Sequence, residues 1–319
     1  MNNPFRGLSA IVAGNPMRIV SLLPAATEIC FVLGLGDEVV GVSPECDFPG
    51  EARRKPIVSH ALLQYEGKTS GETSRMVGDR IESGEALYQV DESALRSSSP
   101  DLILTQGLCD VCAPTLGDVE DVASRLPWTP AIESLDPHGL EDMLQDILRV
   151  GRACGIEARA VEVVAALRER IDRVAERAST ALVRPKTLCL EWLDPLFLGG
   201  HWVPEMIGLA GGVDVLGRAG EKSRRAERRE VVVASPDVAV LMPCGFDLDR
   251  TRREAPVVTG TRWWTDLPAA RAGRTWIVDG SGYFNRPGPR LVDGLEILAH
   301  ILHPDLFPKP SDAVAARVS

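Results

Sequence analysis

The feature that most constrains the fold is a long stretch without helix breakers in the middle of the chain. Between Glu157 and Leu182 there is neither glycine nor proline. The apolar residues of this stretch recur at spacings of three and four, which is typical of an amphipathic helix that buries one face. They are Val161, Val164, Leu167, Ile171, Val174, Ala178 and Leu182. The pattern predicts one long helix, which is either a surface helix of a single domain or a rigid connection between two.

Strand and helix patterns alternate on both sides of this stretch. The strand-like runs span residues 18–22, 39–42, 102–105 and 130–133 before it, and 187–192, 238–241 and 275–278 after it. Strands that alternate with helices favour a parallel sheet covered by helices. Because the pattern restarts after the long helix, we expect an α/β fold of two open, Rossmann-like parallel-sheet lobes joined by that single helix.

The chain length fits this division, since 319 residues suit two domains of about 150 residues each. The predicted segments are an N-terminal extension (1–16), an N-terminal lobe (17–154), the connecting helix (155–183), a C-terminal lobe (184–310) and a C-terminal tail (311–319). Within the first lobe, the polar insertion from Gly67 to Glu85 is predicted to form one helix.

Composition and charge exclude several classes of protein. The chain is 45% hydrophobic and 25% charged, the profile of a soluble globular protein. It has no uncharged apolar run of about 18 residues, so we expect no membrane insertion. With 35 basic against 45 acidic residues the net charge is −10, which argues against nucleic acid as a partner.

Cysteine usage bears on the compartment. The seven cysteines are an odd number, and the first residues lack the length of a secretory signal. We therefore expect a reducing, cytoplasmic setting. A periplasmic or other extracytoplasmic location is the alternative if a leader has been removed.

Aromatic residues follow several predicted strands directly. In open α/β sheets, ligands bind at the carboxyl ends of the strands. Exposed rings on loops are unfavourable without a partner, so these rings either fill the base of each lobe or form a platform for a large planar ligand. The predicted platform consists of Phe48, Trp192, Phe246, Tyr283 and Phe284, with Arg286 as its polar anchor.

Cysteines near the same loops leave a second function open. Cys109 and Cys112 have the spacing of a zinc or redox site, but no second pair of this kind accompanies them. Cys46 and Cys244 could complete a zinc, iron or redox site between the lobes, and such a site could be catalytic. Alternatively, the cysteines are small buried residues packed beneath the loops.

The segment Ser21–Glu28 (SLLPAATE) resembles the opening of the cobalamin-binding receptors of ABC importers, class III solute-binding proteins with a helical backbone. The resemblance runs from about Arg18 to Phe307 and includes the long helix and the stretch Tyr283–Arg290. It implies a binding protein without enzymatic activity, with cobalamin or a related corrinoid held in the cleft between the lobes. It also implies an ABC permease as a partner, and no enzyme cofactor.

The resemblance assigns further residues one by one. Phe48 matches an aromatic position that contacts the corrin ring, and Gln106 matches the apex of a first-lobe loop. The ligand-contacting loop of the second lobe matches Gly282, Tyr283, Phe284, Asn285 and Arg286. The helix start that faces the cleft matches Pro24, Ala25 and Ala26. The thiolate of a cysteine such as Cys109 could also approach the cobalt of a bound corrinoid, and the cysteine-bearing loops favour a cytoplasmic branch of the family.

Overall fold

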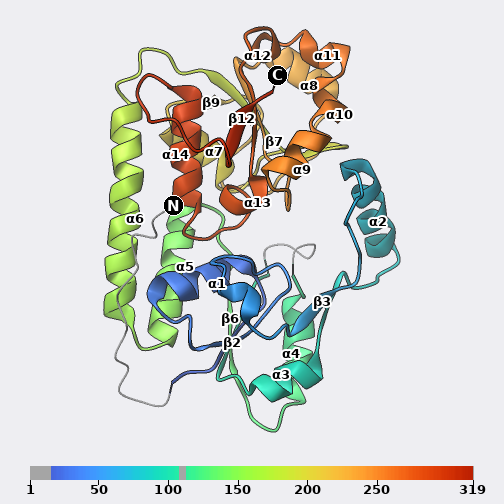
Figure 1. Ribbon diagram of the computed structural model, residues 1–319, viewed down its shortest axis with the longest axis vertical. Coiled ribbons are helices and arrows are strands. Elements are labelled where there is room, and N and C mark those ends of the chain that lie inside the picture. Colours follow the sequence, from blue (N-terminus) through green and yellow to red (C-terminus); the bar gives the residue numbers. More distant parts are fainter. Residues whose placement is uncertain (1–15, 108–112, 319) are drawn as a thin grey trace. The chain divides into compact units, whose positions relative to one another are not determined.

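The computed structural model describes residues 16–107 and 113–318 (Figure 1). Its contacts divide the chain into two compact units. Unit 1 comprises the chain up to Glu66 together with Arg75–Pro137 and Asp142–Ala165, and unit 2 comprises Gly67–Ser74, His138–Glu141 and everything from Ala166 onward. Each unit contains its own sheet, so the α/β fold with two lobes is confirmed.

Unit 1 is built on a four-stranded parallel sheet in the order β2-β1-β5-β6. The strands are β1 (Ile19–Ser21), β2 (Val39–Val42), β5 (Leu102–Thr105) and β6 (Ala131–Ser134). A separate antiparallel pair consists of β3 (Ser59–Ala61) and β4 (Tyr88–Val90). The helices that accompany these strands are α1 (Pro24–Leu33), α3 (Glu92–Ser98), α4 (Leu116–Ser124) and α5 (Leu140–Ala153). Because β1 lies between β2 and β5, the chain order reverses there, which is where such sheets bind ligands.

Unit 2 contains a larger sheet in the order β12-β11-β10-β7-β8, with β9 also paired to β7. Its parallel part consists of β7 (Lys186–Leu193), β9 (Val213–Asp214), β10 (Val238–Leu241) and β11 (Thr275–Val278). Two antiparallel strands, β8 (Leu196–Leu198) and β12 (Ala315–Arg317), join it. The sequence pattern did not predict these two strands, which are each three residues long.

Eight helices of unit 2 follow β8 along the described chain: α7 (Val203–Leu209), α8 (Arg228–Ala234), α9 (Leu248–Glu254), α10 (Pro256–Thr259), α11 (Arg262–Thr265), α12 (Pro268–Arg271), α13 (Gly280–Tyr283) and α14 (Leu291–Leu302). Figure 1 shows α8, α10, α11 and α12 gathered together. These helices are too short to show an amphipathic period in the sequence.

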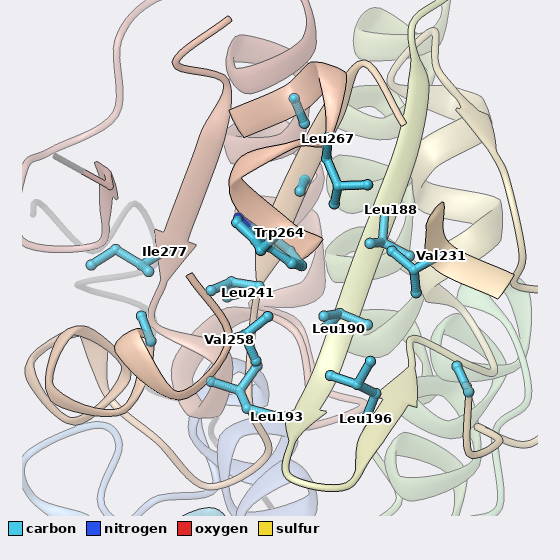
Figure 2. Packing of buried hydrophobic residues seen from close by; sticks show 14 of the residues in the cluster. Leu188, Leu190, Leu193, Leu196, Val231, Leu241, Val258, Trp264, Leu267 and Ile277 are labelled. Carbon is cyan, nitrogen blue, oxygen red and sulfur yellow. The ribbon is translucent and has the colours of Figure 1, made fainter. Parts of the chain in front are cut away.

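The core of unit 2 centres on Trp264, which is 1% exposed. Its ring lies among leucines from β7 and β10 and Val258 from α10 (Figure 2). The indole N–H of Trp264 is buried without a hydrogen-bond partner among the described residues. The side chain therefore stabilises the unit through its apolar surface rather than its polar atom.

The long helix predicted from the sequence is α6 (Glu157–Ala178), and the division between the units falls within it, after Ala165. It ends four residues earlier than the apolar pattern suggests, because Ser179 and Thr180 bond back to the carbonyls of Glu176 and Arg177. Leu182, placed on its apolar face from the sequence, is fully exposed.

The sequence predicts a helix start at Asp136-Pro137, where a capping residue precedes proline at the first helical position. This prediction is wrong, since α5 begins at Leu140. The Asp136 carboxylate accepts hydrogen bonds from the Ser134 hydroxyl and the Gly107 amide instead of capping the helix. The Leu140 amide donates to the Glu205 carboxylate at 2.9 Å. The helix is thus capped by a residue distant in the sequence.

Replacing Trp264 tests the role of this core. We expect Trp264→Ala to lower the free energy of unfolding by about 3–5 kcal/mol, because it leaves a large cavity. Trp264→Phe should lower it much less, since it also removes the unpaired N–H. Guanidinium unfolding curves measure both, with Val233→Ala (76% exposed) as the surface control. Equal losses for the alanine and phenylalanine variants would contradict this account.

Asp146 on α5 makes stability depend on pH. The residue is 2% exposed, its Oδ2 has no partner among the described residues, and its Oδ1 lies 3.4 Å from Arg149. Burial raises its pKa to about 7, although Arg149 acts in the opposite direction. The native state therefore holds this proton more tightly than the unfolded state, and stability is lost as the pH rises from about 4 to about 7.

We therefore expect Asp146→Asn to raise the free energy of unfolding at pH 8 and to have little effect at pH 4. Urea unfolding at the two pH values measures this difference. Asp172→Asn, an exposed carboxyl on α6, is the matched control and should show no such dependence. A gain at pH 4 equal to the gain at pH 8 would show that Asp146 is not the titrating group.

Candidate functional site

The carboxyl ends of the parallel strands locate the candidate site in each unit. In unit 1 these ends lead into residues 22–26, 43–49 and 106–107. In unit 2 they lead into residues 194–195, 242–247 and 279–290. With Trp192 near the end of β7, these segments carry every described residue that the sequence assigned to ligand binding.

The turn from β1 into α1 is fixed by two hydroxyls. Ser21 Oγ donates to a backbone carbonyl two residues further on at 3.0 Å, and Thr27 Oγ1 donates to Ser21 Oγ at 2.8 Å. Pro24 opens the helix and is half-buried, whereas Ala25 and Ala26 are 2% and 0% exposed. Of these three predicted contact residues, only Pro24 presents appreciable surface.

The loop after β2 separates a buried thiol from an exposed ring. Cys46 is 3% exposed, and its Sγ lies 3.0 Å from Thr27 Oγ1 and 3.3 Å from Ser43 Oγ, within hydrogen-bonding distance of both hydroxyls. Burial raises the pKa of the Cys46 thiol, although the two hydroxyls act in the opposite direction. Phe48, two residues further on, is 45% exposed, so its ring is accessible to a ligand.

The loop after β5 is anchored at its start. Gln106 is 6% exposed, and the Gly107 amide donates to the Asp136 carboxylate at the end of β6. The two loops are thereby tied together. Cys109 and Cys112 lie outside the described residues, so their predicted roles stay predictions.

Two of the predicted platform rings meet in unit 2. Trp192 and Phe246 pack edge to face with ring centroids 5.3 Å apart, a favourable aromatic geometry. Trp192 is half-buried, and its indole N–H donates to the Asp194 carbonyl at 3.1 Å. Phe246 is 1% exposed, and the Arg250 guanidinium carbon lies 3.7 Å from its ring centroid. Phe246 is therefore a buried ring that packs against Trp192, and the expectation that it is exposed to a ligand is wrong.

Phe284 and Asn285 hold their own loop in place. Phe284 is fully buried, and its carbonyl accepts a hydrogen bond from the Trp202 indole at 2.7 Å. The side-chain amide of Asn285, in the orientation that satisfies its neighbours, donates to the carbonyls of Gly280 at 2.7 Å and Met242 at 3.3 Å. The buried Phe284 ring is core, which corrects its placement on an exposed platform.

The same loop presents Tyr283 and Arg286, which are both half-buried. The Arg290 guanidinium carbon lies 5.5 Å from the Tyr283 ring centroid. The Gly282 amide donates to the Asp279 carboxylate at 2.7 Å, and burial raises the pKa of Asp279. Tyr283 and Arg286 thus keep part of their side-chain surface exposed, whereas Phe284 does not.

An open pocket of about 1050 Å³ lies beyond the end of β7. Its lining includes Leu193, Asp194, Arg225, Arg228 and Trp263. The Trp263 indole N–H is buried without a partner among the described residues. The lining combines apolar and charged surface and includes none of the side chains that the sequence assigned to the site.

The predicted cysteine site is only partly covered. Cys46 and Cys244 are free thiols, buried and half-buried respectively, whereas Cys109 and Cys112 fall in the gap of the structure. Within residues 16–107 and 113–318, no group of three or more histidine, cysteine, aspartate or glutamate side chains could hold a metal ion. The four-cysteine site therefore stays a prediction.

Sequence reasoning missed Arg250 and Glu191. The amide of Arg250 donates to Asp247 Oδ1 at 2.7 Å in the first turn of α9, and the helix places its side chain over Phe246. Glu191 interrupts the apolar strand β7, its Oε2 accepts from the Gly200 amide at 3.2 Å, and burial raises its pKa. An aspartate cap after Phe246 and an acidic residue inside a buried strand were the available signals.

Comparisons with known proteins agree over most of the chain. Residues 19–280 match the family model described as periplasmic binding protein. An uncharacterized ABC transporter substrate-binding lipoprotein, YvrC of Bacillus subtilis, is 25% identical over 92% of this chain and 82% of its own. A vitamin B12-binding protein of Vibrio parahaemolyticus is 23% identical, covering 92% of each chain. The structure of a periplasmic heme-binding protein from Pseudomonas aeruginosa has a TM-score of 0.72 and 19% identity, covering 95% of this chain and 98% of its own.

These comparisons overturn the expectation of a cytoplasmic setting. The matching family is named for periplasmic proteins, and one relative is named a lipoprotein. The odd number of cysteines and the shortness of the first apolar stretch therefore did not predict the compartment. The assignment to a cytoplasmic branch of the family, inferred from the cysteine-bearing loops, is also wrong. Across the part of the chain that the structure describes, no helix is both long and apolar enough to cross a bilayer.

The buried thiol of Cys46 provides a test of the first-unit loop. Because its pKa is raised and its surface is covered, we expect Cys46 to react with iodoacetamide at pH 7.5 far more slowly than the half-buried Cys244. Mass spectrometry of the labelled peptides from the folded protein measures both rates. Unfolding in guanidinium should remove the difference, and equal rates in the folded protein would contradict the burial of Cys46.

Proposed function

Since the chain belongs to the periplasmic binding protein family, whose members bind substrates and are not enzymes, we propose that its ligand is cobalamin or a related corrinoid. The observation that carries this proposal is the match to a vitamin B12-binding protein over 92% of both chains. A match of this extent spans most of both units and is not confined to one of them.

The accessible rings support a flat, largely apolar ligand. Phe48 in unit 1 and Trp192 in unit 2 both offer ring surface at the carboxyl ends of parallel strands. Rings of this kind stack on planar ligands and provide large contact areas. We propose that Phe48, Trp192 and Tyr283 contact the corrin ring, and that Arg286 hydrogen-bonds its amide fringe.

The buried members of the predicted set contribute indirectly in this proposal. Phe246 and Phe284 are at most 1% exposed, so they hold Trp192 and the loop around Tyr283 in position. Ala25 and Ala26 are likewise buried and position Pro24 at the start of α1. The ligand itself contacts the residues around them.

An ABC permease is the proposed protein partner. The YvrC relative is named as an ABC transporter substrate-binding lipoprotein, and a solute-binding protein of this class delivers its ligand to a permease. A cysteine-lined metal or redox site is the weaker alternative, because Cys46 is only 3% exposed and its Sγ is already in contact with the hydroxyls of Thr27 and Ser43.

Ligand binding tests the proposal directly. We expect the wild-type protein to bind cobalamin with a measurable heat in titration calorimetry and a change in the cobalamin absorption spectrum. Phe48→Ala and Trp192→Ala should each raise the dissociation constant about tenfold or more, as expected for an aromatic anchor. Phe48→Tyr and Trp192→Phe keep a ring and should retain most of the affinity.

Leu182→Ala, at a fully exposed position, is the surface control, and circular dichroism confirms that each variant is folded. Hemin serves as the competing planar ligand. Binding of hemin without binding of cobalamin would refute the corrinoid proposal while leaving a planar-ligand site in place. Absence of binding to either molecule would refute both.

A further inference from the structure

The inserted segment Gly67–Ser74 belongs to a different unit from the chain on either side of it. The segment clusters with unit 2, whereas the residues up to Glu66 and from Arg75 onward belong to unit 1. It contains the first turn of α2 (Ser70–Glu82). We call Gly67–Ser74 the strap.

A buried carboxylate holds the strap on α9. The Ser70 amide and the Ser70 hydroxyl both donate to Glu254 Oε1, at 2.8 Å and 2.6 Å. Glu254 is 8% exposed and Ser70 is fully buried. Hydrogen bonds to a charged acceptor are stronger than neutral ones, so this pair is a specific latch.

The latch is not needed to form α2 itself. Thr69 and Glu72 already cap the helix, since the Thr69 amide and hydroxyl donate to Glu72 Oε2 at 2.9 Å and 3.0 Å and the Glu72 amide donates back to Thr69 Oγ1 at 3.2 Å. The contact from Glu254 therefore fixes where the helix lies rather than whether it forms.

Little else on α2 is buried. The buried residues of this helix are Ser70, Gly71 and Thr73, all in its first turns. The remainder is half-buried or exposed, with Ile81 52% exposed. Along the chain, α2 lies between β3 and β4. An element with so little buried area opens more easily than the core.

Glycines in the left-handed region flank α2 on both sides. Gly67 has φ +72° and Gly84 has φ +68°, and neither would meet any atom within 4 Å if it carried a Cβ. Open space and backbone freedom at both positions would allow the segment between them, which contains α2, to move as one rigid piece.

The strap also contacts the residue that packs on a platform ring. Arg250 donates from its guanidinium to the Lys68 carbonyl at 3.3 Å, and the same guanidinium lies over Phe246. Arg250 and Glu254 are four residues apart on α9 and therefore share one face. Arg250 thus links the strap to Phe246, the ring that packs against Trp192.

We propose that the strap is a gate for the ligand site, closed by the Ser70–Glu254 latch. This inference rests on the proposed function, because the gate regulates ligand exchange at the Trp192 ring, which packs against Phe246. The ligand enters and leaves while the strap is released. Association and dissociation rates then both scale with the population of the released state.

Three variants of the full-length chain test the latch. Glu254→Ala removes both hydrogen bonds, Ser70→Ala removes only the hydroxyl bond, and Glu82→Ala alters the exposed far end of α2 as the matched control. We expect amide exchange of residues 70–73 in the ligand-free protein, followed by mass spectrometry, to become about tenfold faster in Glu254→Ala and less so in Ser70→Ala. Glu82→Ala should leave this exchange unchanged.

Stopped-flow measurement of cobalamin binding tests the gate. In Glu254→Ala we expect both the association and the dissociation rate to rise about tenfold, with the dissociation constant changing less than about threefold. Combining Glu254→Ala with Ser70→Ala should add nothing further, because the two side chains form one contact.

The outcomes separate this proposal from the proposed function. Unchanged amide exchange in Glu254→Ala overturns the latch. Faster exchange with unchanged cobalamin rates overturns the gate but leaves cobalamin binding intact. If the wild-type protein binds no cobalamin, the proposed function fails and the gate fails with it, whatever the amide exchange shows.

Discussion

The parallel pairing of the central strands is the constraint on which both units depend. In unit 1, β1 pairs with β5 so that Val20 lies opposite Ile103, and in unit 2, β10 pairs with β7 so that Val240 lies opposite Cys189. Every residue of β1, β5, β10 and β11 is buried, as expected for strands covered on both faces. Parallel pairing brings the carboxyl ends of neighbouring strands to one edge, and this edge collects side chains from distant parts of the sequence.

The sequence predicts those elements of the fold whose local residue pattern matches the environment that the folded chain provides for them. Continuous apolar runs identified β5, β10 and β11, and the absence of glycine and proline identified α6. The start of α5 could not be predicted, because Glu205, which caps it at Leu140, is 65 residues away. Likewise, the four-residue helices α10, α11 and α12 form around Trp264 and have no period of their own.

The candidate site is also only partly predictable from the sequence, because contacts with distant residues decide which side chains are exposed. The strand-end rule found the right loops, but a single sequence does not distinguish a ring that faces outward from one that fills the core. Phe48 and Phe246 each follow a cysteine by two residues, yet they are 45% and 1% exposed. The difference arises from neighbours such as Arg250 and Trp192, which cover Phe246. The family match corrected the compartment, which cysteine counting had misjudged.

The loops that follow β10 and β11 are joined into one body. The Ser281 amide donates to the Phe246 carbonyl at 3.0 Å, and Asn285 reaches the carbonyl of Met242. A Cβ at Gly280 would lie 2.6 Å from the Pro243 carbonyl oxygen, so the two loops are packed too closely there to accept any side chain. A substitution that changes the shape of one loop therefore displaces the other, and a change of ligand specificity here is expected to need compensating substitutions in both.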